Sequence, residues 1–229
     1  MPLENRAATP RPLIKICGTT SLPDAQLAAR AGADYLGVII EHAPSPRSVS
    51  LETARAIFTS TDLPTVAVTV NQSREFLLNI QRELRPAALQ LHGDESPELA
   101  RALIQNGATV WAACDNRERA MQMRDAGASA IVIDARAVQN NATIYGGTGA
   151  RSDWNLAREL VHELVQDGTR VILAGGLHPR NVGEAIEFVQ PWMVDVVSGV
   201  EERQGVKSLS KVAEFIAAAQ LAQPKSTPE

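Results

Sequence analysis

Two side chains in this sequence are suited to a pair of proton transfers. Cys17 ends a short apolar run and precedes a glycine, and Asp134 follows three consecutive apolar residues. A thiolate can act as a general base, and a carboxylic acid can act as a general acid. Lys15 would share a strand face with Cys17, and its charge would help to hold a thiolate. Cys17 and Asp134 each have an ordinary structural alternative, because cysteine is commonly a buried apolar side chain and aspartate is commonly a loop or cap residue.

Two glycine-containing segments have the composition of phosphate-binding loops. Gly175 and Gly176 follow one apolar run, and Ser198 and Gly199 follow the next. Glycine lets backbone amides approach an anion closely, and a helix that starts after such a loop adds partial positive charge. Tight turns also require glycine, so the alternative is a pair of ordinary loops.

Three further residues lie in segments that could reach a ligand. Arg47 follows the second apolar run and could bind a carboxylate with two hydrogen bonds, or be a solvated loop arginine. Gly147 lies in a long segment, 135–152, whose length and glycines indicate a mobile lid, or a surface insertion. Cys114 also ends an apolar run and is the main rival of Cys17 as the catalytic thiol.

The sequence lacks the common signatures of metal and nucleotide sites. The four histidines are scattered and the two cysteines lie far apart, so no zinc-ligand spacing is present. No dinucleotide-binding G-x-G-x-x-G unit and no G-x-x-x-x-G-K-[ST] loop occurs. The residues therefore give no sign of a metal site or a nucleotide site.

The composition restricts the class of partner. The chain has 229 residues, of which 21% are charged, and a net charge of −4, so a basic face for nucleic acid is not expected. No run approaches the roughly 18 to 20 apolar residues of a membrane span, and residues 1–12 lack the apolar part of a signal peptide. We expect a cytoplasmic protein that binds neither nucleic acid nor membrane.

The elements that must position these residues follow a regular repeat. Eight short apolar runs lie at residues 13–17, 35–40, 65–70, 88–91, 109–113, 130–133, 171–174 and 193–196. The segments between them start with helix-capping residues, such as Ser21, Ser50, Ser73, Ser96 and either Ser152 or Asp153, and often end with glycine. Runs that are apolar on both faces are typical of parallel strands covered by helices. We predict a single α/β domain, a closed (β/α)8 barrel over 13–221, with a flexible extension at 1–12 and a polar tail at 222–229.

The barrel brings the candidate residues to one end, because barrels of this class carry catalytic groups at the carboxyl ends of their strands. If Lys15 points inward it needs a counter-charge, and Asp195 on the neighbouring eighth strand is the natural partner. The first and fifth strands lie on opposite sides, so a disulfide between Cys17 and Cys114 is not expected.

As an ordered set, these segments resemble the phosphoribosylanthranilate isomerase family of the tryptophan pathway. The resemblance runs from about residue 13 to residue 207 and rests on residues 15–20 (KICGTT), 33–37 (ADYLG), 45–47 (SPR), 89–95 (LQLHGDE), 146–149 (GGTG), 153–154 (DW), 173–177 (LAGGL), 181–182 (NV), 195 (D) and 198–201 (SGVE).

The resemblance implies an Amadori rearrangement of N-(5′-phosphoribosyl)anthranilate to the carboxyphenylamino deoxyribulose phosphate. It makes Asp134 the general acid on the ring oxygen and Cys17 the general base on the neighbouring carbon, and neither step needs a metal ion or an organic cofactor. It places the substrate carboxylate on Arg47. It places the phosphate on the two glycine segments and gives less defined roles to His92 and Asp195. The full set of further substrate-binding residues that it implies is His92, Asp195, Gly147, Gly175, Gly176, Ser198 and Gly199.

The chain departs from the family pattern near the strands and the lid. Bulky aromatic residues of the family are replaced on the second strand by Val38 and Ile40 and, before the Asp-Trp pair, by Ser152; the other departures are Ala67, Thr69, Val197 and Gln204. We expect these changes to alter the walls of the substrate site and the anchor of the lid, and to spare the acid and the base.

Two other functions compete with this interpretation. One is a phosphosugar isomerase or epimerase with the same barrel and a different substrate, which would not need Arg47. The other is a non-catalytic phosphate-binding barrel, which would have no reason to keep both Cys17 and Asp134.

We expect a monomer or a homodimer.

Overall fold

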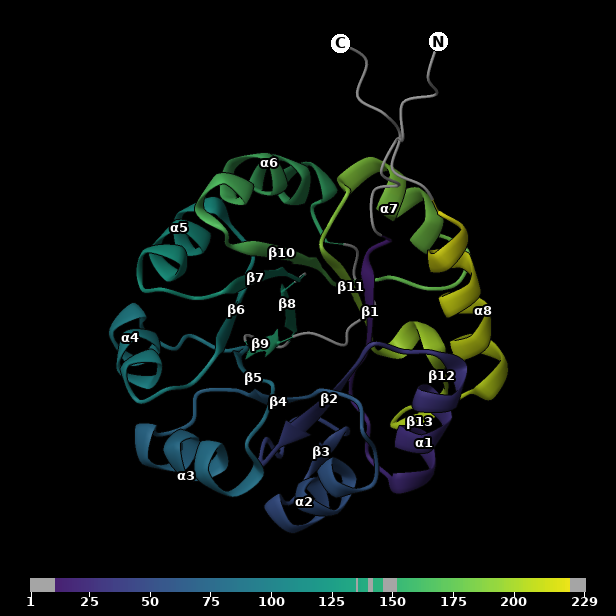
Figure 1. Ribbon diagram of the computed structural model, residues 1–229, viewed down its shortest axis with the longest axis horizontal. Coiled ribbons are helices and arrows are strands. Elements are labelled where there is room, and N and C mark those ends of the chain that lie inside the picture. The colour runs from purple at the N-terminus through teal and green to yellow at the C-terminus, as the bar shows by residue number, and fades with distance from the viewer. Residues whose placement is uncertain (1–10, 135, 140–141, 146–151, 223–229) are drawn as a thin grey trace, which may run out of the picture.

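The computed structural model describes residues 11–134, 136–139, 142–145 and 152–222, and it contains a closed parallel barrel. The strands pair in the order β1, β11, β10, β7, β6, β5, β4, β2, and β2 pairs with β1 to close the ring (Figure 1). In chain order the barrel strands are β1 (Leu13–Ile16), β2 (Tyr35–Ile40), β4 (Thr65–Thr69), β5 (Ala88–Leu91), β6 (Val110–Cys114), β7 (Ala130–Ile133), β10 (Arg170–Leu173) and β11 (Met193–Val196). The predicted fold class is confirmed.

A ring of helices covers the outside of the barrel (Figure 1). The expected caps are confirmed at Ser21, Ser50, Ser73, Ser96 and Asp153, whose side chains accept backbone N–H groups of the following turn. The helices in the described residues are α1 (Leu22–Ala31), α2 (Leu51–Thr59), α3 (Arg74–Leu84), α4 (Pro97–Gln105), α5 (Arg117–Asp125), α6 (Trp154–Leu164), α7 (Val182–Val189) and α8 (Leu209–Leu221). None of them is long and apolar enough to cross a membrane.

Several short elements lie outside the eight barrel strands and the helices that cover them. The segment that we expected to be a long loop contains an antiparallel hairpin of β8 (Arg136–Gln139) and β9 (Ala142–Tyr145), drawn across the centre of the ring in Figure 1. Both strands carry β-branched residues, and their register pairs Arg136 with Tyr145 and Gln139 with Ala142. The remaining short elements are β3 (Ser48–Val49), the 3-10 turns η1 (Val165–Asp167) and η2 (Ser198–Val200), and the hairpin of β12 (Glu201–Arg203) and β13 (Val206–Lys207).

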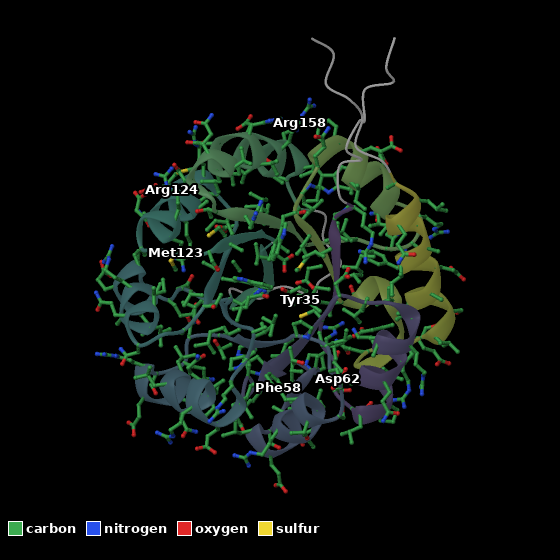
Figure 2. The ribbon with its side chains drawn as sticks, viewed as in Figure 1. Tyr35, Phe58, Asp62, Met123, Arg124 and Arg158 are labelled. Carbon is green, nitrogen blue, oxygen red and sulfur yellow. The ribbon has the colours of Figure 1, made fainter. Side chains whose placement is uncertain are left out.

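Aromatic side chains fill the amino-terminal end of the barrel interior. Trp111 lies 5.6 Å from Tyr35 and 5.9 Å from Trp192, measured between ring centroids. Tyr35 lies near the centre of the ring in Figure 2. We call these three residues the aromatic floor. They close the barrel below the polar residues, so a ligand can approach those residues only from the opposite end.

Polar side chains occupy the next levels of the interior. Lys15, Gln90 and Asp195 lie in the middle of the barrel, and Cys17 and His92 lie two residues farther along their strands on the same face. Gly37 on β2 makes room for them: a methyl group there would overlap the Cys17 sulfur and lie 2.9 Å from Lys15 Cε. The barrel can therefore hold a lysine and a thiol side by side because this position has no side chain.

The departures on the second and third barrel strands do not line the interior. Val38, Ile40 and Ala67 belong to the core between the barrel and the helices, while their neighbours Val66 and Val68 face inward. Side chains alternate between the two faces of a strand, which places these three positions on the outer face. Our expectation that they alter the walls of the substrate site is wrong; they change the packing of helices on the barrel.

β1 begins at Leu13 and α8 ends at Leu221. The flexibility that we expect for residues 1–12 and 222–229 stays a prediction, and most of both segments lies outside the described residues.

Candidate active site

The candidate residues come from segments at the carboxyl ends of several strands. Cys17 follows β1, Arg47 lies between β2 and β3, His92 follows β5, and Asp134 follows β7. Asp195 lies on β11 itself, and the glycine segments follow β10 and β11. Gly147 lies outside the described residues. The topology therefore directs these groups toward the end of the barrel that faces away from the aromatic floor.

Lys15 is the buried cation of the site, with no exposed surface. Its ammonium nitrogen donates to Asp195 Oδ2 at 2.7 Å and to Gln90 Oε1 at 2.9 Å, and it also hydrogen bonds to Cys17. An ammonium group has three donors, and these partners use all of them. Burial alone would lower the pKa of Lys15, but the Asp195 carboxylate and the Cys17 sulfur outweigh it and raise the pKa. The predicted pairing of Lys15 with Asp195 is confirmed.

Cys17 is a buried thiol rather than a ready thiolate. Burial raises its pKa, and the negative charge of Asp195 raises it further. Lys15 and Lys207 lower the pKa without cancelling these two effects. Lys15 therefore acts in the direction that we expected, but in net effect the site disfavours the thiolate. Only a small fraction of Cys17 is therefore thiolate at neutral pH, but that thiolate is a strong base.

Asp134 and His92 form the second reactive pair. His92 Nε2 lies 3.2 Å from Asp134 Oδ2, and both side chains are about nine-tenths buried. On its other side, His92 Nδ1 lies 2.8 Å from Gln90 Nε2. Gln90 also accepts from Lys15, so a continuous set of contacts joins Cys17 and Lys15 to Asp134.

Arg47 is held by a carboxylate of the protein. Its Nε and Nη2 donate to the two oxygens of Glu201 at 2.7 and 2.8 Å, and the pair is buried. Nη1 makes no hydrogen bond to the residues that the structure describes. The expectation that Arg47 forms two bonds to a substrate carboxylate must therefore be corrected, because the fork is taken by Glu201 and Nη1 is the part left for a ligand.

The β12–β13 hairpin supplies a second cation to this cluster. Lys207 is buried and donates to the Val197 carbonyl at 3.1 Å and to Glu201 at 3.4 Å. Burial lowers the pKa of Lys207, and Glu201 only partly offsets this. Burial would likewise raise the pKa of Glu201, but Arg47 and Lys207 hold it below its usual value. Two cations therefore share one carboxylate beside Cys17.

The two glycine segments meet in space. A methyl group at Gly199 would overlap the Leu177 carbonyl, so the turn after β11 packs directly on the loop after β10. Gly175 and Gly176 have φ values of 79° and 65°, which side chains disfavour. Ser152, one of the departures, donates its hydroxyl to the Ala174 carbonyl at 2.5 Å and so ties the start of α6 to the same loop.

Cys114 faces away from the other candidates. It belongs to the core between the barrel and the helices, whereas Cys17 belongs to the barrel interior. Neither cysteine forms a disulfide. The placement favours Cys17 as the catalytic thiol. Among the described residues, no group of three or more His, Cys, Asp or Glu side chains could hold a metal ion.

Three residues of the site were not singled out from the sequence. Gln90 and Glu201 lie inside recognisable motifs, and Lys207 ends the region of resemblance, but none was given a role. Alternation along β5 places Gln90 on the same face as His92, which is a signal that sequence reasoning could have used. No comparable signal identifies Glu201 or Lys207, because both lie in an irregular hairpin. Glu201 also lies 154 residues along the chain from its partner Arg47.

Comparison with known proteins gives a consistent picture. A family model described as N-(5′phosphoribosyl)anthranilate (PRA) isomerase matches residues 14–218. Relatives named N-(5′-phosphoribosyl)anthranilate isomerase include that of Aquifex aeolicus, 40% identical over 207 residues, 89% of this chain and 96% of the relative. The relative from Trichlorobacter lovleyi is 39% identical over 209 residues, 89% and 95% of the two chains.

Solved structures agree with these relatives. Phosphoribosyl anthranilate isomerase from Thermotoga maritima is 32% identical and superposes with a TM-score of 0.77, covering 91% of this chain and 98% of that one. Another solved phosphoribosyl anthranilate isomerase, in complex with reduced 1-(o-carboxyphenylamino)-1-deoxyribulose 5-phosphate, is 31% identical with a TM-score of 0.75 over the same shares of the chains.

The Glu201 cluster generates a stability prediction. Glu201→Gln is expected to lower the free energy of unfolding by on the order of 3 kcal/mol, because Arg47 and Lys207 remain as buried cations without their carboxylate. Urea unfolding measures the change. Glu83→Gln is the matched control, because the Glu83 pair with Arg55 is exposed, and less than about 1 kcal/mol is expected there. Equal losses in the two variants would contradict the account.

The Asp195 charge generates a pH prediction. Asp195→Asn, made in a Cys114→Ala background, is expected to lower the pKa of Cys17, because the negative charge that opposes the thiolate is removed while Lys15 keeps Gln90 as a partner. Titration of the ultraviolet absorbance of the thiolate measures the shift, with exposed Asp125→Asn as the control. A thiolate that appears at the same or a higher pH than in the parent would show that Asp195 does not control this group.

Proposed function

The chain belongs to the N-(5′-phosphoribosyl)anthranilate isomerase family, and on that premise we propose that Cys17 and Asp134 are the base and the acid of its reaction. The observation that carries the proposal is the continuous set of contacts from Cys17 through Lys15, Gln90 and His92 to Asp134. Two proton-transfer groups of opposite function thus belong to one buried network at the open end of the barrel.

The reaction is an intramolecular redox isomerisation of the Amadori type and a step of tryptophan biosynthesis. N-(5′-phosphoribosyl)anthranilate becomes 1-(2-carboxyphenylamino)-1-deoxyribulose 5-phosphate. C1′ of the ribose is reduced and C2′ is oxidised, so the reaction needs no external oxidant or reductant. The chain is therefore an isomerase of the aldose-ketose type.

Asp134 acts in the first step. Its carboxylic acid gives a proton to the ring oxygen as the bond from C1′ to that oxygen breaks, and the nitrogen lone pair forms the C1′=N iminium. Oδ2 is engaged with His92, so the proton that is delivered belongs on Oδ1. The high burial of the pair strengthens the hydrogen bond that holds the acid in place.

Cys17 acts in the second step. Its thiolate takes the proton from C2′, and the electrons of that bond move toward the iminium nitrogen to give an enolamine. Protonation at C1′ and loss of the hydroxyl proton at C2′ then give the ketone. The raised pKa of Cys17 makes the thiolate a strong base for a carbon acid, and Lys15 stays beside it as the counter-charge.

Substrate binding falls to the residues around this pair. We place the phosphate on Gly175, Gly176, Ser198 and Gly199, which are partly exposed where two loops meet. Arg47 Nη1 binds the anthranilate carboxylate. Asp195 Oδ1 is buried and has no hydrogen-bond partner among the described residues, so it is suited to accept from a ribose hydroxyl. His92 and Gly147 complete the proposed contacts.

We keep three finer expectations as proposals. The reaction proceeds without a metal or an organic cofactor, because the acid and the base account for both proton transfers. The protein is cytoplasmic and binds no nucleic acid. It is a monomer or a homodimer, and a solved relative from Thermotoga maritima is described as monomers generated from a dimeric phosphoribosylanthranilate isomerase.

The catalytic assignment generates an activity prediction. The wild type is expected to consume freshly prepared phosphoribosylanthranilate, followed by fluorescence. Asp134→Asn and Cys17→Ala are each expected to lose activity by about 10²- to 10⁴-fold, the usual worth of a positioned acid or base. Cys114→Ala is the matched control and keeps wild-type turnover.

Two results would overturn these assignments. A wild type that does not consume the substrate would remove the proposed function. Full turnover by Cys17→Ala together with inactivity of Cys114→Ala would give the base role to the other cysteine.

A further inference from the structure

We propose that Gln90 is a positioning residue that sets the tautomer of His92 and thereby aims an N–H group at Asp134. The inference rests on the proposed role of Asp134 as the acid. Gln90 has no exposed surface and lies between the buried cation and the histidine. It touches neither Cys17 nor Asp134 in the contacts of the site, so any influence on catalysis passes through His92.

Lys15 determines which way the Gln90 amide faces. The ammonium nitrogen lies 2.9 Å from one end of the amide, and an ammonium group can only donate hydrogen bonds. The end that faces Lys15 must therefore be the oxygen Oε1. Rotating the amide by half a turn would place its NH₂ group against the ammonium, with donors opposed in a buried site.

The amide in turn determines where His92 carries its hydrogen. With Oε1 toward Lys15, the NH₂ group lies 2.8 Å from His92 Nδ1, which must then offer a lone pair. The ring hydrogen is therefore on Nε2, 3.2 Å from Asp134 Oδ2, and it is donated to that oxygen. Each group in the series from Lys15 to Gln90, His92 and Asp134 donates to the next, and reversing any member brings two donors together.

This arrangement also gives a hydrogen on His92 Nδ1 no acceptor. An imidazolium would carry a hydrogen on Nδ1 directed at the Gln90 NH₂ group. The other titratable groups that face His92 are Asp134 and His42, and the pKa of His42 is lowered by burial and by His92 itself. Asp134 Oδ2 therefore faces the ring hydrogen on His92 Nε2, which leaves Oδ1 as the oxygen that carries the acid proton.

The series is not a proton wire. A primary amide passes a proton only through its unstable imidic acid form, so Gln90 transmits orientation and not protons. This distinguishes the proposal from a relay between the base and the acid. The expected phenotype of a change at Gln90 is a change in His92 and a lower kcat, without a new proton pathway.

Nitrogen-15 spectra of the histidine side chains test the proposal directly. The wild type at pH 7.5 is expected to show a pyridine-type Nδ1 and a pyrrole-type Nε2 for His92, assigned by loss of the signals in His92→Gln. Gln90→Met fills the same space without hydrogen bonds and is expected to give mixed tautomers. Gln90→Glu offers Nδ1 an acceptor and is expected to move a hydrogen onto Nδ1.

The control is Gln122→Glu, which makes the same chemical change on α5, beside Glu118 and away from the series. It is expected to leave the His92 signals unchanged. In parallel, kcat of Gln90→Met and of Gln90→Glu is expected to fall by on the order of 10- to 100-fold with little change in KM, the size of effect that a misplaced catalytic group has.

The outcomes separate this proposal from the proposed function. A wild-type His92 that carries its hydrogen on Nδ1, or that is an imidazolium, would overturn the proposal, and this result needs no variant to fold. A wild-type tautomer population in Gln90→Met would also overturn it. Activity that survives Asp134→Asn would instead remove the acid role of Asp134 and leave the tautomer result standing.

Discussion

A charged lysine in the middle of a closed barrel is the constraint on which the rest of this site depends. An ammonium group without solvent is tolerated only if each of its donors finds an acceptor and a negative charge lies nearby. Lys15 meets the condition with Asp195, Gln90 and Cys17, and the barrel gives up a side chain at Gly37 to make room. Each of these partners faces the proposed reaction centre, so satisfying the lysine also arranges the chemistry.

The same cation acts differently on the two sides of the site. Toward Cys17 it is a counter-charge, which limits how far burial and Asp195 raise the pKa of the thiol. Toward Asp134 it acts indirectly. Lys15 orients the Gln90 amide, and the amide determines which His92 nitrogen carries the hydrogen that faces Asp134. A third set of charges, Arg47, Glu201 and Lys207, lies beside the base, and among the described residues it leaves Arg47 Nη1 without a hydrogen bond.

Sequence reasoning predicted the parts of this structure that follow from local pattern and strand alternation. Eight apolar runs with capped segments between them predicted the barrel, and the need of an inward-facing lysine for a counter-charge on the adjacent strand predicted that Lys15 meets Asp195. The same alternation places Val38, Ile40 and Ala67 on the outer face of their strands, against the helices, so the expectation that they line the site overlooked it. The Glu201 clamp on Arg47 could not be predicted, because it depends on an irregular hairpin whose position no periodic pattern specifies. The thiol was expected to be activated, since a neighbouring lysine is visible in sequence and the cost of burial is not.

The central claim is that Asp134 and Cys17 act in different steps, and an isotope effect separates the steps. The rate with substrate deuterated at C2′ is compared with the rate for the ordinary substrate. In Cys17→Ser, removal of the C2′ proton becomes slower, and the account predicts an isotope effect that rises above the wild-type value. In Asp134→Asn, ring opening becomes slower, and the account predicts an effect that falls toward one. Equal isotope effects in the two variants, or the opposite order, would contradict the assignment of base and acid.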